Sequence, residues 1–267
     1  MTTPHLRFAT FLAPSVFPVY QAITDHVGQR LGCATSLVVG ESFGAFAAGE
    51  VDAGFICGLP YVDLADQAPP AVVPLAAPVL QGPRYQGRPV YFSDVVVRRD
   101  SPFRAFADLR GARWSYNDPD SHSGYNLTRY ELVRRGETRG YFGAVLAAGW
   151  HQESIRWVAE GTVDASAIDS QVLAIALRDD PALAARLRVI ATFGPSTIQP
   201  VVAAARLPAD VREQMRAALL SMAEDPALRA VLAAGFVERF VPVDDATYDD
   251  IRHMRDAAVS AGFLTLR

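Results

Sequence analysis

The chain alternates short apolar runs with longer stretches in which apolar residues recur every three or four positions. Residues 6–11 alternate apolar and polar side chains, which predicts a first strand. Segment 18–31 has the spacing of an amphipathic helix, and 34–39 is typical of a second strand. Residues 51–57 are so apolar that the strand they predict should be covered on both faces of a sheet. This order predicts an α/β protein with largely parallel sheets.

The rest of the chain continues the alternation after a turn-rich passage from Pro69 to Pro89. Further strands are expected at 90–98, 114–116, 165–168 and 188–193, and helices at 42–48, 107–111, 125–135, 151–159, 170–177, 209–222, 226–234 and 246–258.

Two strand-like crossings, near 91–94 and 193–196, indicate that the middle of the chain is an inserted lobe. We therefore expect lobe 1 to comprise 1–92 and 195–267, and lobe 2 to comprise 93–194. Open α/β sheets bind ligands beyond the carboxyl ends of their strands, so a cleft between the lobes is the expected binding place.

Composition narrows the possible functions. Half of the 267 residues are hydrophobic, which is enough for a sizeable core, and the net charge of −4 without a basic cluster argues against a nucleic-acid partner. Cys33 and Cys57 lack the spacing of a zinc site, so we expect neither a metal nor another cofactor, and no disulfide framework. The chain shows no signal-peptide pattern, and the uncharged stretch 67–83 is interrupted by prolines, so no membrane insertion is expected.

The most informative segment is the polar loop 118–124, which lies between a predicted strand and a predicted helix. A helix N-terminus offers backbone N–H groups without intrahelical acceptors and a positive partial charge, and Ser121 and Ser123 add hydroxyl donors. The loop can therefore hold a phosphate-like or carboxylate anion. The alternative is that Ser123 only caps the helix.

Ser121-His122-Ser123-Gly124-Tyr125 after Asp118-Pro119-Asp120 resembles the Asp-x-x-Ser-Thr-Ser-Gly loop of the phosphate/phosphonate/phosphite-type solute-binding proteins of ABC importers. His122 stands where that loop has threonine, and Trp150 replaces a small residue beside His151. Further similar segments follow in the same order along the chain: 51–61, 91–93, 100–102, 108–111, 150–153, 161–165, 168–170, 225–226 and 240–245.

The resemblance implies a two-lobed, type II periplasmic-binding-protein fold, with two hinge crossovers and a ligand cleft between the lobes. It also implies ligand-binding roles by position. The residues concerned are Ser121, His122, Ser123, Gly124, His151, Tyr61, Tyr91 and Asp169.

Ordinary structural roles stay open for several of these residues. His151 could be a helix-start histidine, and Tyr61 and Tyr91 could be core or rim aromatics. Asp169 could cap the helix that begins near Ser170.

The sequence lacks the GxSxG, HExxH, Walker and GxGxxG motifs, and we expect no catalytic residue. The expected function is a monomeric solute receptor for a small anionic ligand, working with an ABC permease and located outside the cytoplasm. Two alternatives remain, an intracellular sensor if Met1 is the native start, and an enzyme on the same fold.

Overall fold

The computed structural model describes residues 5–266, which form two compact units. Unit 1 runs to Val90 and resumes over Thr197–Asp249, and unit 2 comprises Tyr91–Ser196 and the chain from Asp250 onward. The crossings lie close to the expected boundaries. The C-terminal segment differs from the expectation, because it belongs to unit 2 rather than to the first lobe.

The sheet of unit 1 is mixed, with the strand order β11-β4-β10-β3-β1-β2. Strand β1 pairs in parallel with β2 and β3, whereas β10 and β11 are antiparallel to their partners, so the expectation of largely parallel sheets is wrong here. Its strands are β1 (His5–Thr10), β2 (Ala34–Val39), β3 (Ala53–Phe55), β4 (Val72–Leu80), β10 (Val201–Ala204) and β11 (Val237–Pro242). The wholly buried β3 lies inside this sheet, as its composition predicted.

Strand β4 lies in the passage that was expected to be turn-rich, and that expectation is wrong. Pro74 and Pro78 have no N–H to donate, which is why they resemble strand breakers in the sequence. The ladder to β10 shifts register beside Pro74, so a bulge accommodates the missing donor. Burial of the apolar residues along β4 then outweighs the turn signal.

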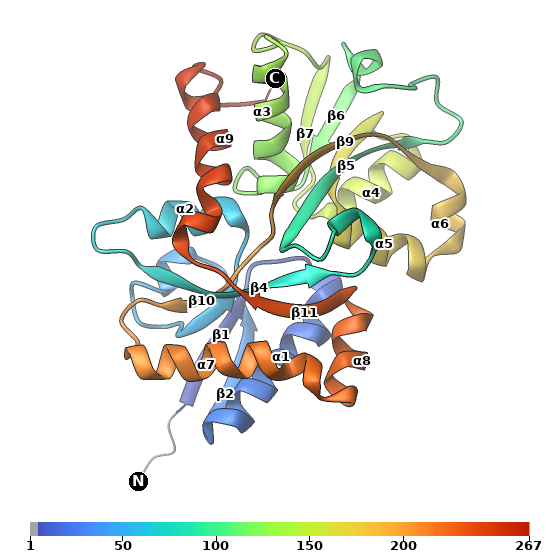
Figure 1. Cartoon of the computed structure of the whole chain (residues 1–267). Helices are drawn as coiled ribbons and strands as arrows, with labels where there is room; N and C mark the ends of the chain where they lie inside the picture. Colours follow the sequence, from blue (N-terminus) through green and yellow to red (C-terminus); the bar gives the residue numbers. More distant parts are fainter. Residues whose placement is uncertain (1–4, 267) are drawn as a thin grey trace. The chain divides into compact units, whose positions relative to one another are not determined.

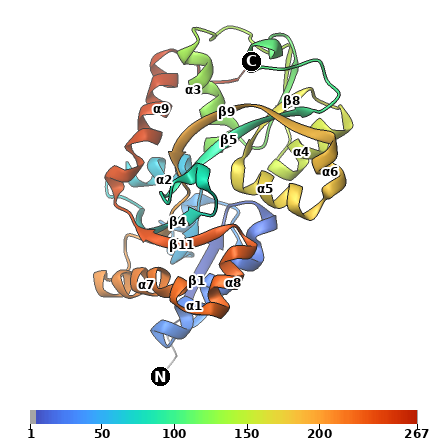
Figure 2. The same cartoon turned by 45° about the vertical axis from the view of Figure 1, so that its right-hand side comes forward.

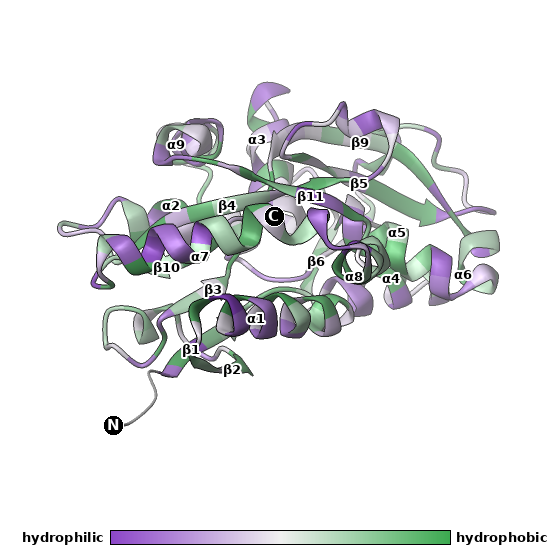
Figure 3. Ribbon diagram, turned by 60° about the horizontal axis from the view of Figure 1, so that its bottom comes forward, coloured by the Kyte–Doolittle hydropathy of each residue, from purple (hydrophilic) through white to green (hydrophobic). Residues whose placement is uncertain are grey.

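Helices α1 and α7 of unit 1 contact each other, and α7 also contacts β4 and β11 (Figure 1). Figure 3 shows hydrophilic and hydrophobic residues alternating along both helices, as expected of helices that cover a sheet with one face. The expected helix at 42–48 is only a short 3₁₀ turn, Phe43–Ala45. The helices of this unit are α1 (Phe17–Leu31), α2 (Gly58–Ala65), α7 (Ala209–Ser221) and α8 (Pro226–Ala234).

The sheet of unit 2 has the order β7-β6-β8-β5-β9, with β6 parallel to β7 and β8, and β5 antiparallel to β8. Helices α4 and α5 pack on β8 (Figure 2). The strands are β5 (Val90–Arg98), β6 (Arg113–Tyr116), β7 (Ala144–Ala147), β8 (Ala165–Asp169) and β9 (Leu187–Thr197). The helices are α3 (Leu127–Arg134), α4 (His151–Glu160), α5 (Ser170–Asp179), α6 (Pro181–Arg186) and α9 (Asp249–Ser260).

The C-terminal segment completes the core of unit 2. Phe263 and Leu266 belong to the same buried cluster as Trp114. The Arg129 guanidinium donates to the Phe263 carbonyl at 3.0 Å, and the Leu266 N–H donates to the Tyr125 hydroxyl at 3.2 Å. These contacts explain why the segment folds with unit 2.

Candidate functional site

The topology of unit 2 brings the predicted site residues, apart from Tyr61, to one edge of its sheet. Strands β6, β7 and β8 are parallel, so their carboxyl ends meet at the same edge. Strand β5 is antiparallel to β8, with Ser93 opposite Asp169, so the start of β5 with Tyr91 lies there too. The polar loop follows β6, and His151 follows β7. This is the edge at which open α/β sheets bind ligands.

Ser121 is the N-cap of the helix that follows the loop, and it lies in extended conformation with φ −75° and ψ 127°. Its hydroxyl accepts a hydrogen bond from the Gly124 N–H at 3.1 Å. The cap is therefore Ser121 and not Ser123. The first turn, His122–Asn126, is a π-turn that continues into α3, and such turns often occur at functional sites. A helix start of this kind can hold an anion.

Ser123 and His151 form a buried polar pair. Ser123 Oγ lies 3.1 Å from His151 Nε2, and the two residues are 1% and 6% exposed. Burial lowers the pKa of His151 to about 3, so the ring is neutral near pH 7. Its Nδ1 is buried and has no hydrogen-bond partner among the residues that the structure describes. The Ser93 hydroxyl donates to the Ser123 carbonyl at 2.7 Å and holds the turn against β5.

Gly124 makes room for close packing around this pair. A Cβ at this position would overlap Asn117 Oδ1 and would lie 3.1 Å from His151 Cε1. The absence of a side chain thus lets the helix turn approach the end of β6 and the start of α4.

The side chain of His122 is fully buried, and its ring points toward the interior of unit 2. Its Nε2 lies 2.8 Å from Ser196 Oγ, whose proton is donated to Asp250 Oδ2 at 2.8 Å, so Nε2–H is the donor to Ser196. The Asn126 amide nitrogen donates to the other ring nitrogen at 3.1 Å. Burial lowers the pKa of His122 to about 4, against the opposing charge of Asp250. Both ring nitrogens are therefore engaged by protein groups.

The remaining predicted residues of unit 2 are buried as well. Asp169 is 2% exposed and caps α5, accepting from the N–H groups of Gln171 and Val172 at 2.8 and 3.3 Å. Tyr91 is fully buried, and its ring centroid lies 6.3 Å from that of His122. The capping role proposed as the alternative for Asp169 is thus present.

Tyr61 belongs to unit 1, on α2. Its hydroxyl donates to Asp245 Oδ1 at 2.7 Å, and its ring packs on Tyr248 with centroids 4.5 Å apart. The side chain is fully buried.

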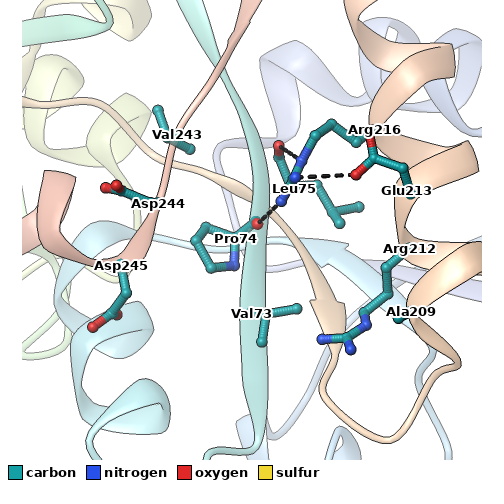
Figure 4. A pocket seen from close by; sticks show the side chains of 10 residues that line it. All are labelled: Val73, Pro74, Leu75, Ala209, Arg212, Glu213, Arg216, Val243, Asp244 and Asp245. Atoms are coloured by element: carbon teal, nitrogen blue, oxygen red, sulfur yellow. Dashed lines mark hydrogen bonds and ion pairs between the residues drawn. The ribbon is translucent and has the colours of Figure 1, made fainter.

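A pocket of about 430 Å³ opens in unit 1 beside Asp245, and the sequence had not indicated it. Figure 4 shows Arg212 and Arg216 of α7 on one side of β4, and Asp244 and Asp245 on the other side. Arg216 is held by the Leu75 carbonyl at 3.0 Å and by Glu213 at 3.1 Å. Because the walls carry both signs of charge, the pocket does not present a cationic surface to an anion.

Several residues that support the site carry no sequence signal of their own. Ser93, Asn117, Ser196 and Asp250 are scattered along the chain, and only their folded contacts join them to the loop.

Over residues 5–266, no cluster of three or more metal-ligating side chains occurs, and no helix is long and apolar enough to cross a membrane. Within these residues, neither Cys33 nor Cys57 forms a disulfide.

Comparison with known proteins identifies the family. Residues 9–248 match the sequence profile described as ABC transporter, phosphonate, periplasmic substrate-binding protein.

The fold is that of solved binding proteins at low sequence identity. A binding protein component of an ABC phosphonate transporter from Pseudomonas aeruginosa is 18% identical, with a TM-score of 0.82, over 94% of this chain and 85% of that one. A Prochlorococcus marinus protein in complex with methylphosphonate is 16% identical, with a TM-score of 0.83, over 97% and 98% of the chains. A Xanthomonas citri protein bound to ATP is 19% identical, with a TM-score of 0.72, over the same shares.

The two-sheet α/β architecture is accordingly the type II periplasmic-binding-protein fold that the sequence resemblance implied. This is a family of transport proteins and not of enzymes, and its members deliver small ligands to ABC permeases. The chain belongs to the periplasmic substrate-binding proteins of ABC phosphonate transporters.

Proposed function

We propose that the chain binds a phosphonate, or a similar tetrahedral oxyanion, at the helix turn that begins with Ser121. The observation that supports this most directly is the buried pair of Ser123 Oγ and His151 Nε2 at a helix N-terminus. A neutral His151 can donate its Nε2 proton to Ser123, which leaves the serine hydroxyl proton for the ligand. The helix start adds N–H donors and positive partial charge.

The other predicted residues take supporting places in this proposal. Gly124 allows the close packing of the turn. Tyr61, Tyr91, His122 and Asp169 stay predicted ligand contacts, and each already has a protein partner in its own unit.

The identity of the ligand can be tested by measuring the binding of a series of compounds. Methylphosphonate and ATP are the compounds bound by two similar proteins, so the series contains small phosphonates, inorganic phosphate, sulfonates and phosphate esters. Isothermal titration calorimetry measures each dissociation constant.

Ser123→Ala is the decisive variant. It removes one hydroxyl donor to a charged acceptor, and we expect the phosphonate affinity to fall about tenfold or more, which is roughly 1.4 kcal/mol. Ser221→Ala is the matched control, because Ser221 lies on α7 of unit 1 and its hydroxyl donates to the Ala218 carbonyl at 3.1 Å. Equal affinity of Ser123→Ala and the wild type would refute the site.

The proposed role is that of a monomeric, non-catalytic receptor in the periplasm that passes its ligand to an ABC permease. Sedimentation should give the monomer mass of 28.9 kDa, and the phosphonate should be recovered unchanged after incubation. Release of inorganic phosphate during incubation would argue for an enzyme instead.

A further inference from the structure

Trp150 is the only exposed side chain among the phenylalanines, tyrosines and tryptophans of residues 5–266, with 41% of its surface open. The two other tryptophans both have contacts with other side chains. Trp114 is fully buried and stacks on Phe142 with centroids 4.5 Å apart, and Trp157 is partly buried and bonds Glu153. The indole of Trp150 makes no ring contact within the described chain. Its apolar surface is therefore available to a ligand.

The position of Trp150 is set by the connection between β7 and α4. The Ala148 N–H donates to the Tyr116 carbonyl at 2.8 Å, which ties this connection to the end of β6. Gly149 then turns the chain with φ +82°, and Trp150 follows as the N-cap of α4 without a side-chain cap bond. The indole thus emerges at the same sheet edge as the polar loop.

The neighbour of Trp150 in the chain is His151, whose ring lies 3.1 Å from Ser123 Oγ. The apolar ring of Trp150 therefore directly precedes, in the chain, one of the two residues of the proposed anion site. Because the exposed indole directly precedes His151 in the chain, we expect the organic substituent of a ligand whose oxyanion binds at Ser123 to extend toward this ring.

We infer that Trp150 is a platform for the organic substituent of the ligand, so that the protein prefers phosphonates with a flat, apolar substituent over methylphosphonate. This inference rests on the proposed function, because the oxyanion must bind at the loop. Stacking of an aromatic group on an indole supplies affinity that a methyl group cannot match, since the contact area is larger.

The test compares phenylphosphonate with methylphosphonate by calorimetry in the intact chain. The wild type should bind phenylphosphonate about fivefold to tenfold more tightly. Trp150→Ala should bring the ratio of the two dissociation constants close to one, and Trp150→Phe should restore part of it. Trp157→Phe, on the same helix, is the matched control and should keep the wild-type ratio.

Tryptophan fluorescence gives a second readout. Phenylphosphonate should change the emission of the wild type and of Trp157→Phe, and this change should be absent in Trp150→Phe. An unchanged affinity ratio in Trp150→Ala would overturn the platform alone. Failure of the wild type to bind either phosphonate would overturn the proposed function, and the inference with it.

Discussion

His122 and His151, which lie in or beside the same loop, have different hydrogen-bonding roles. His151 offers one ring nitrogen to Ser123, and burial keeps it neutral. His122 uses both ring nitrogens to join the loop to Asn126 and Ser196. The motif predicted that both residues belong to the site. It could not distinguish their orientations, because Ser196, which accepts from His122, and Asp250, which binds Ser196, come from distant parts of the chain.

The buried histidines make stability depend on pH. Burial lowers the pKa of His122 to about 4 and that of His151 to about 3, from 6.5. Below pH 6.5 the unfolded chain therefore binds protons that the folded chain does not. The contribution of these two histidines to the free energy of unfolding is fully present above about pH 6.5. It falls by up to roughly 1.4 kcal/mol per pH unit for each histidine as the pH drops toward about 4 for His122 and about 3 for His151.

Replacing His151 should reduce this dependence. We expect His151→Asn to lessen the loss of stability between about pH 7 and pH 5.5 by roughly 1 kcal/mol, measured by urea unfolding. His253→Asn, at an exposed position on α9, is the control. The same pH dependence in His151→Asn and wild type would show that His151 is not kept neutral by the fold.

At the scale of elements, the first turn of the helix packs closely against its neighbours. Gly124 brings the turn against Asn117, at the end of β6, and against His151, at the start of α4. The glycine was predicted from its motif. The need for a residue without a Cβ became evident only from the position of Asn117, which lies in an ordinary polar loop in the sequence.

A double-mutant cycle tests this packing. Gly124→Ala should destabilise the wild type by about 1–3 kcal/mol, because the new Cβ displaces the Asn117 side chain. In an Asn117→Ala background the same change should cost much less. Chemical denaturation measures all four free energies of unfolding, and simple additivity would contradict a direct clash.

At the scale of the whole molecule, the chain builds unit 2 from two separated stretches. The sequence predicts that the last stretch lies in the other lobe, because the second crossing indicates a return of the chain to that lobe. Phe263 and Leu266 instead fill the core around Trp114. The sequence around an apolar C-terminal residue does not indicate in which unit that residue is buried.

Replacing neighbouring C-terminal residues by alanine should therefore change the stability of the protein by very different amounts. Phe263 is 1% exposed and Leu264 is 62% exposed. Phe263→Ala should cost about 3–5 kcal/mol and lower the melting temperature clearly, whereas Leu264→Ala should change the stability by less than about 0.5 kcal/mol. Thermal unfolding of both variants measures the difference. Similar effects of the two substitutions would mean that the segment is not part of this core.

The α/β class, the order of most elements, the family and the loop with its serines could all be predicted from the sequence. Local spacing and short motifs carry this information, because capping, periodicity and turn chemistry act over a few residues. Tertiary structure alone decided the antiparallel strands, the strand that contains Pro74 and Pro78, the inward turn of His122 and the place of the C-terminal segment. These features depend on contacts between residues far apart in the chain, and the free energy of burial that selects them has no local signature.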